Sequence, residues 1–186
     1  AVMRTGAAAR RPNPYLLRPP GAQVEKDFLA RCIRCSECVK VCPTGGLQVS
    51  LLEGGVEGFG TPLLVPRLGY CDYSCNRCGQ TCPTGAIPPL DLAAKRLTVI
   101  GHAYINRDLC LPWARDQACI VCEEMCPTPQ KAIVLEEVEV ENARGEKVQL
   151  QRPRVVYDLC IGCGICEYMC PLEGEPAIRV QVPTIL

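Results

Sequence analysis

Aromatic side chains are scarce in this chain of 186 residues, which contains two Phe, one Trp and six Tyr. It has 17 Pro and 16 Gly, residues that add little to an apolar interior. Such a composition gives little material for a large hydrophobic core. Something other than side-chain packing must therefore organise the fold.

Net charge is also lacking, because 20 basic residues balance 20 acidic ones. Nucleic-acid-binding proteins need a basic surface, and no RNA- or DNA-binding motif is present, which argues against that function. No apolar run is long enough to cross a bilayer. Membrane association of these residues would then come through a partner protein or a missing N-terminal segment.

Catalytic motifs are missing as well. The one histidine, His102, has no nucleophile or carboxylate at motif spacing and is interpreted as structural. The glycine-rich connection at 54–60 lacks the Gly-Lys-Ser/Thr ending of a phosphate loop, which argues against nucleotide binding.

Cysteine, by contrast, is abundant, with sixteen residues in four groups of four. Every group closes on Cys-x-x-x-Cys-Pro, and the first and last groups match the bacterial ferredoxin run. The sequence therefore predicts four [4Fe–4S] clusters. The predicted iron ligands are Cys32, Cys35, Cys38, Cys42, Cys71, Cys75, Cys78, Cys82, Cys110, Cys119, Cys122, Cys126, Cys160, Cys163, Cys166 and Cys170.

The spacing within a group has a mechanical reason. Three thiolates on a tight loop can each bind a different iron of one cube, but the fourth iron faces away from the loop. The trailing Cys-Pro supplies the fourth ligand of a neighbouring cluster, as in two-cluster ferredoxins, and the proline turns the chain just after it. The groups are therefore expected to work in pairs.

Two groups are irregular, since group two has one extra residue after Cys71 and group three has eight residues between Cys110 and Cys119. Neither change removes a ligand, and a longer loop costs little closure entropy. We expect regular groups to pair with each other, and irregular with irregular, as in four-cluster subunits of molybdenum oxidoreductases; consecutive pairing is the alternative. In this nested scheme Cys170 completes the site of Cys32, Cys35 and Cys38, Cys42 that of Cys160, Cys163 and Cys166, Cys126 that of Cys71, Cys75 and Cys78, and Cys82 that of Cys110, Cys119 and Cys122.

Disulfide frameworks and zinc modules are two other classes of cysteine-rich protein. A disulfide framework has no reason to place proline after every fourth cysteine. Zinc modules usually separate two Cys pairs by a longer loop. The fourfold repeat of three-plus-one spacing is more specific than any single Cys-x-x-Cys and favours iron–sulfur clusters.

The expected fold class is α+β, with tandem bacterial-type ferredoxin modules in which short helices and small β-hairpins surround the clusters. After each Cys-Pro an apolar pair leads toward a strand. These pairs are Gly46-Leu47, Ala86-Ile87, Ala132-Ile133 and Ala177-Ile178. Helices are predicted at 25–31 and 90–96, and a hairpin from 135–140 and 148–150 around a turn at 142–145.

Two parts of the chain are distinguished by composition. Residues 1–22 are predicted to be an extended N-terminal arm or linker, and 23–186 a four-cluster ferredoxin domain with cysteine groups at 32–42, 71–82, 110–126 and 160–170. Small residues at 1–9 precede Arg10-Arg11-Pro12-Asn13-Pro14. This beginning is interpreted as the remainder of a cleaved signal, the end of a membrane segment, or a disordered tail.

A family resemblance rests on these motifs. The segment Leu17-Arg18-Pro19-Pro20-Gly21-Ala22, with Glu25, Phe28 and the first cysteine group after it, resembles polyferredoxins of the NapG/MauM type. So do the long first spacing of group three and the tail Gly162-Cys163-Gly164-x-Cys166-Glu167. The resemblance spans about 16–180. Group two is closer to the C-terminal ferredoxin part of NapH-like membrane-bound 4Fe–4S proteins.

The resemblance implies an electron-transfer polyferredoxin that relays electrons between a membrane quinol-linked module and a reductase. The implied partners are redox proteins: a membrane quinol-oxidising subunit, and a terminal reductase or large catalytic subunit. A periplasmic or membrane-associated location is implied too. Full thiolate ligation leaves no open iron for a substrate, so an electron carrier and not an enzyme is predicted. The alternatives are an accessory protein for maturation of a redox enzyme and the ferredoxin subunit of a cytoplasmic tungsten or molybdenum oxidoreductase.

Overall fold

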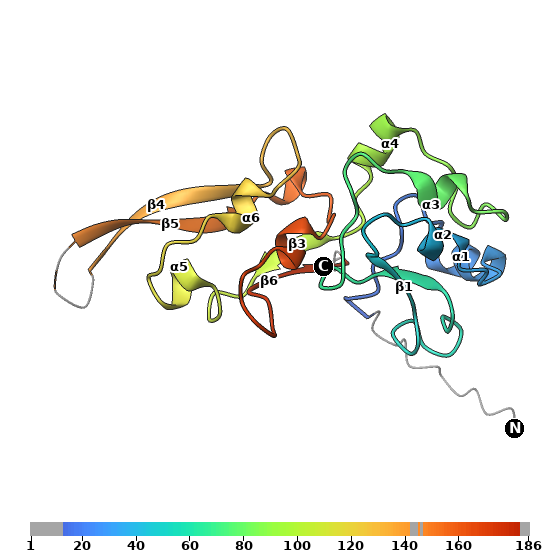
Figure 1. The fold of residues 1–186 in the computed structure, drawn as a ribbon, viewed down its shortest axis with the longest axis horizontal. Coiled ribbons are helices and arrows are strands. Elements are labelled where there is room, and N and C mark those ends of the chain that lie inside the picture. The colour runs from blue at the N-terminus through green and yellow to red at the C-terminus, as the bar shows by residue number, and fades with distance from the viewer. Residues whose placement is uncertain (1–12, 142–144, 146, 183–186) are drawn as a thin grey trace, which may run out of the picture.

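The computed structural model describes residues 13–141, 145 and 147–182. These residues form two neighbouring halves, which lie side by side in Figure 1. We call residues 13–98 the N-terminal half and residues 99–182 the C-terminal half. Each half contains two of the four cysteine groups.

The N-terminal half is built from short elements. They are α1 (Glu25–Arg31), α2 (Glu37–Lys40), β1 (Leu47–Val49), β2 (Pro62–Leu64), α3 (Arg77–Gln80) and α4 (Leu92–Leu97). Helix α1 has the predicted bounds. Helix α4 begins two residues later than predicted, because the Asp91 side chain accepts a hydrogen bond from the Ala94 N–H at 2.7 Å and caps it there.

The C-terminal half contains the longer strands. Its elements are β3 (His102–Ile105), α5 (Leu111–Ala114), α6 (Val121–Glu124), β4 (Ile133–Glu141), β5 (Lys147–Val155), the 3₁₀ turn η1 (Tyr157–Leu159), α7 (Ile165–Tyr168) and β6 (Ile178–Gln181). Strand β3 pairs antiparallel with β6, and β4 with β5. In Figure 1 the β4–β5 hairpin extends away from the rest of the C-terminal half. No helix in the described ranges has the length and apolar character needed to cross a bilayer.

The predicted strands are present with one exception. The β4–β5 hairpin is longer than predicted, and most of its predicted turn, 142–144, lies outside the described residues. Ala86 and Ile87 are buried but form no strand. The Ile87 N–H donates a hydrogen bond to Cys82 Sγ at 3.4 Å. This N–H group therefore binds a sulfur atom and does not pair with a neighbouring strand.

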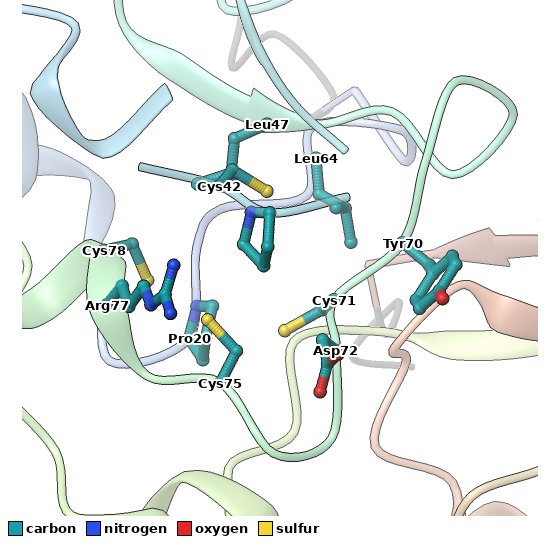
Figure 2. Close-up of a pocket in the computed structure, with 11 residues that line it drawn as sticks. Pro20, Cys42, Leu47, Leu64, Tyr70, Cys71, Asp72, Cys75, Arg77 and Cys78 are labelled. Atoms are coloured by element: carbon teal, nitrogen blue, oxygen red, sulfur yellow. The ribbon is translucent and has the colours of Figure 1, made fainter. Parts of the chain in front are cut away.

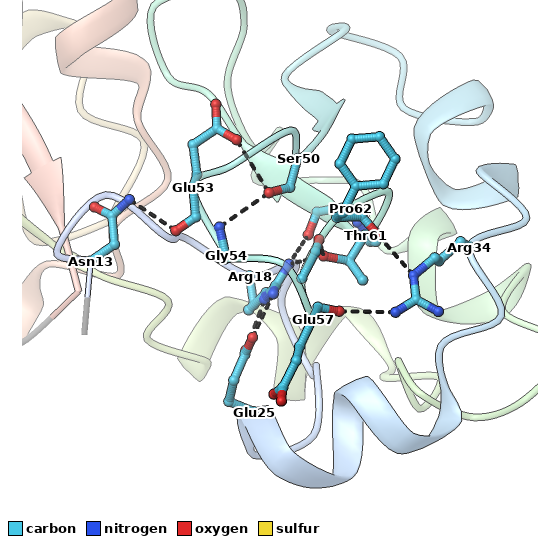
Figure 3. Close-up of polar contacts among 12 residues, drawn as sticks. Asn13, Arg18, Glu25, Arg34, Ser50, Glu53, Gly54, Glu57, Thr61 and Pro62 are labelled. Carbon is cyan, nitrogen blue, oxygen red and sulfur yellow. Dashed lines mark hydrogen bonds and ion pairs between the residues drawn. The ribbon is translucent and has the colours of Figure 1, made fainter. Parts of the chain in front are cut away.

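The expected arm at 1–22 is corrected from Asn13 onward, and residues 1–12 lie outside the described part. Leu17 is buried, and its carbonyl accepts from the Leu64 N–H at 2.8 Å. Arg18 donates to Thr61 Oγ1 at 2.9 Å and forms an ion pair with Glu25 (Figure 3). This segment belongs to the core of the N-terminal half, because its side chains cover the sheet there.

The two halves meet along the second cysteine loop. The Cys71 N–H donates to the Cys163 carbonyl at 2.8 Å, which joins a cysteine loop of one half to a cysteine loop of the other. The rings of Tyr70 and Tyr168 pack with centroids 5.4 Å apart. Arg67 donates to three carbonyl oxygens across the contact, those of Glu167 at 3.2 Å, Cys170 at 3.2 Å and Leu172 at 2.6 Å. The loops that carry the cysteines are thus held at fixed relative positions.

Candidate iron–sulfur centres

A one-turn helix holds the third cysteine of each group. Cys38 lies in α2, Cys78 in α3, Cys122 in α6 and Cys166 in α7. Helix α2 packs against α3, and α6 against α7. Each trailing cysteine follows its helix directly and so emerges beside the neighbouring group of the same half.

The sixteen cysteines surround four cavities, four cysteines to each. We name the cavities sites A to D. Site A is lined by Cys32, Cys35, Cys38 and Cys82; site B by Cys42, Cys71, Cys75 and Cys78; site C by Cys126, Cys160, Cys163 and Cys166; site D by Cys110, Cys119, Cys122 and Cys170. Every site combines three cysteines of one loop with one trailing cysteine of the neighbouring group.

The nested pairing expected from the sequence is wrong. The trailing cysteines are exchanged between consecutive groups, so that Cys42 reaches site B and Cys82 reaches site A. The irregular spacings do not change this exchange, because they lie at the loops and not at the packed helices. The long insertion of group three forms α5, which contacts β5. Packing of α2 on α3 and of α6 on α7, and not the spacing of the first two cysteines, decides the partners.

The cavities are small and mainly apolar. Sites B and D have volumes of about 30 Å³, and sites A and C of about 20 Å³. Figure 2 shows site B, where the sulfur atoms of Cys42, Cys71, Cys75 and Cys78 surround one space next to Pro20. All sixteen cysteines are free thiols. Four sulfurs around a small apolar cavity fit a cubane cluster, whose four irons each need a separate thiolate.

Hydrogen bonds reach several of these sulfur atoms. The Ala103 N–H donates to Cys160 Sγ at 3.4 Å. Threonine hydroxyls lie beside three trailing cysteines, at 3.5 Å for Thr44 and Cys42, 3.8 Å for Thr84 and Cys82, and 3.2 Å for Thr128 and Cys126. Sequence reasoning missed these threonines, although Cys-Pro-Thr recurs in three of the four groups. Such contacts to ligand sulfurs are one determinant of cluster potential.

Burial acts on the protonation of the thiols. Burial, with neighbouring thiolates adding to it, raises the pKa of Cys38 to about 11 and that of Cys78 to about 12. Burial also raises the pKa of Cys122 to about 12. Burial would raise the pKa of Cys42 as well, but the Thr44 hydroxyl and backbone N–H groups outweigh it, so this pKa is lowered. A buried thiolate needs a positive partner, and iron supplies that charge when a cluster is bound.

Charged side chains gather at site B. Asp72 and Arg77 line it, and the buried Lys95 donates a hydrogen bond to the Asp72 carbonyl. Sequence reasoning missed Lys95, since an isolated lysine in a short helix has the pattern of a surface residue. It also missed Arg67, whose partners are 100 to 105 residues away in the sequence.

Comparison with known families agrees with the exchange of ligands. Residues 31–86 match the 4Fe–4S dicluster domain, which spans the first two cysteine groups as one unit. Residues 153–173 match the 4Fe–4S binding domain and contain the fourth group. These matches show 4Fe–4S ferredoxin domains in both halves, within a fold of short helices and small antiparallel sheets.

Similar proteins cover most of the chain. The methylamine utilization ferredoxin-type protein MauM of Methylorubrum extorquens is 40% identical over 168 residues, covering 88% of this chain and 71% of the relative. MauM of Paracoccus denitrificans is 39% identical over 183 residues, covering 97% and 76%. The ferredoxin-type protein NapG of Escherichia coli is 38% identical over 170 residues, covering 88% and 69%. The chain therefore belongs to the family of ferredoxin-type proteins that includes MauM and NapG.

Proposed function

We propose that this protein is an electron-transfer polyferredoxin that holds four [4Fe–4S] clusters, one in each of sites A to D, with all sixteen cysteines as ligands. The observation that carries the proposal is the set of four small cavities, each lined by four cysteines. With every iron bound by a thiolate, no coordination position is left for a substrate. The protein is therefore a carrier of single electrons and not an enzyme.

The protein's own residues give the clusters their setting. Apolar side chains such as Leu47 and Leu64 at site B, and Ile133 and Val180 at site C, exclude water. Backbone N–H and threonine hydroxyl groups face the ligand sulfurs. When bound, each cluster supplies one-electron redox chemistry, with a potential set by these contacts, by charge and by exposure.

The four sites form one ordered path, A to B to C to D. Cys38 of site A and Cys78 of site B lie in α2 and α3, which pack together. Sites B and C meet where the Cys71 N–H contacts the Cys163 carbonyl. Cys122 of site D and Cys166 of site C lie in α6 and α7, which also pack together. Electrons that enter at either outer site can thus cross the protein through the junction between the halves.

In the proposed role this path connects a membrane quinol-linked module with a reductase, in the periplasm or at the membrane. The partners are then redox proteins, one at each outer site. The chain is similar to ferredoxin-type proteins over most of its length, and this similarity supports electron transfer as its activity. The two ends of the path, at sites A and D, provide separate positions for a donor and an acceptor.

The cluster content is tested by anaerobic reconstitution with iron and sulfide. We expect about sixteen iron and about sixteen sulfide per chain, since each cubane contains four of each. Zinc in place of iron, or oxidised disulfides without sulfide, would contradict the proposal.

The relay is tested with membrane vesicles supplied with a quinol. The reconstituted protein should be reduced by these vesicles and then reoxidised by the reductase that they contain or receive. A Cys75→Ser variant, in which site B is damaged in the middle of the path, is the control and should carry electrons poorly. Full reduction by dithionite with none by the quinol-charged vesicles would exclude this relay.

A further inference from the structure

Lys95 is a buried charge without a salt-bridge partner. It lies in α4, and only 2% of its surface is exposed. A lysine is almost never fully buried unless its ammonium is paired. In the part of the chain that the structure describes, its ammonium forms no ion pair with a carboxylate.

The ammonium is directed at site B. It donates a hydrogen bond to the backbone carbonyl of Asp72 and lies 5.9 Å from the centroid of the Tyr73 ring. Burial raises the pKa of the Cys71 thiol, and the positive charge of Lys95 opposes that rise. Lys95 thus lies against the loop that carries Cys71 and Cys75.

Among the described residues, site B is the only one of the four with a buried lysine hydrogen-bonded to the backbone next to a ligand cysteine. The residues that line sites C and D are uncharged apart from their cysteines. Site A has Arg34, but its guanidinium is exposed and donates to the carbonyls of Glu57 and Phe59 (Figure 3). An exposed charge is screened by water and salt, whereas a buried one is not.

The sign of the effect follows from electrostatics. One electron from a reduced protein partner adds one negative charge at the site, and no bond is made or broken. A fixed positive charge nearby stabilises the more negative state. Net charge and hydrogen bonds to sulfur are recognised determinants of cluster potential.

We propose that Lys95 raises the reduction potential of the cluster in site B and makes this inner site a holding point for the electron at the junction of the two halves. This inference rests on the proposed function, because it assumes a cluster in site B. The Cys71 loop that receives the charge is the same loop that contacts Cys163 of the other half. The charge therefore acts where an electron passes from one half to the other.

The test is a redox titration followed by electron paramagnetic resonance, on the full chain with iron and sulfide measured first. In Lys95→Met one of the four reduction steps should move to lower potential by at least a tenfold change in equilibrium constant, about 59 mV for one electron. That step should be the one that Cys75→Ser alters. Lys95→Arg, which keeps the charge, should leave it near the wild-type value, and Lys26→Met, at an exposed lysine of α1, should change nothing.

Failure of this inference differs from failure of the proposed function. Wild-type protein without iron and sulfide would remove the clusters themselves. Four clusters with unchanged potentials in Lys95→Met would overturn the role of Lys95 alone. Lys95→Gln, which keeps a donor for the Asp72 carbonyl without the charge, serves if Lys95→Met does not assemble. Loss of the site B cluster in both neutral variants would also overturn the inference, since Lys95 would then be a structural residue.

Discussion

The two inner sites lie on either side of one backbone contact, yet their surroundings differ. Site B is lined by Asp72 and Arg77, and the buried Lys95 donates a hydrogen bond to the Asp72 carbonyl. Site C is enclosed by uncharged residues, among them Ala103, Ile133 and Val180. The three-plus-one arrangement of cysteines is the same in both. The cysteine arrangement therefore defines where a cluster is held, while the surrounding side chains distinguish one site from the next.

The largest expected effect would remove the difference between the two inner sites, because in the proposed function both halves fold around clusters. The buried core includes Cys38, Cys160 and Cys166, and eight further cysteines pack against it. Metal-binding free energy becomes folding free energy when no preformed site exists, and it amounts to about 10–16 kcal/mol for small zinc domains. We expect chelation of iron to abolish most secondary structure in both halves, measured by circular dichroism. A native-like spectrum of the chelated protein would contradict this.

The next effect tests which cysteines share a site. Cys82→Ser and Cys35→Ser both remove ligands from site A in the consecutive pairing. The double variant should therefore lose no more iron than one cluster contains, about four atoms. Combining Cys82→Ser with Cys119→Ser should damage two sites, A and D, and lose about twice as much.

The nested pairing predicts the reverse outcome for the same proteins. Cys82 and Cys119 would then belong to one site, and their double variant would lose a single cluster. Iron and sulfide analysis of the two double variants thus separates the schemes without a structure. Non-additive loss identifies shared partners, since residues that act on one site are coupled and residues on separate sites are not.

The spacing in each loop is a local property, and from it the sequence predicts sixteen candidate ligands. That these cysteines bind iron stays a prediction, whereas helix α1 has the predicted bounds. The destination of Cys42 depends on α2 packing against α3, which no spacing encodes. The regularity of the groups did not predict which groups pair, because the extra residue after Cys71 only lengthens its own loop. The structure has the consecutive pairing of groups, which was the alternative in the sequence analysis.

The elements between the groups were harder to predict because their partners are distant in the sequence. Leu17 reads as part of a proline-rich arm, and only its pairing with Leu64 makes it a core residue. Lys95 and Arg67 read as surface charges for the same reason. Lys95 makes site B unlike site C, and Arg67 joins the two halves. The sequence pattern therefore showed the cysteine arrangement that all four sites share and missed the residues that distinguish or connect them.

A smaller effect is expected at the contact between the halves. Arg67→Gln should weaken three hydrogen bonds from a charged donor to carbonyls of the other half. We expect the free energy of unfolding to fall by about 2 kcal/mol. A hydrogen bond from a charged group contributes at most roughly 1.5–3 kcal/mol, and partial exposure of the Arg67 side chain reduces this contribution. The measurement is the rate of cluster loss in guanidinium, which should rise in this variant.

Arg154→Gln is the matched control for that substitution. Arg154 pairs with Glu136 on the β4–β5 hairpin, and both side chains are about half exposed. Exposed pairs contribute about 0–1 kcal/mol, so the rate of cluster loss should hardly change. Equal rates in the two variants would show that Arg67 does not hold the halves together.

The smallest effect concerns the hydroxyl groups beside the trailing cysteines. Thr128 Oγ1 lies 3.2 Å from Cys126 Sγ at site C and accepts a hydrogen bond from the Ala132 N–H at 3.1 Å, so its own proton is free to point at the sulfur. Thr128→Val keeps the shape and removes the donor. Because hydrogen bonds to ligand sulfur favour the reduced, more negative state, the potential of the site C cluster should fall.

The fall should be smaller than the tenfold change, about 59 mV, expected from the charge of Lys95, since a hydroxyl dipole carries no net charge. Thr128→Ser, which restores the donor, should return the potential to the wild-type value. Thr98→Val is the control, because the Thr98 hydroxyl donates to the Ala94 carbonyl on α4 and contacts no sulfur. A shift at Thr128 equal to that at Lys95 would mean that dipoles and not the buried charge distinguish sites B and C, and the comparison of the two inner sites would have to be redrawn on that basis.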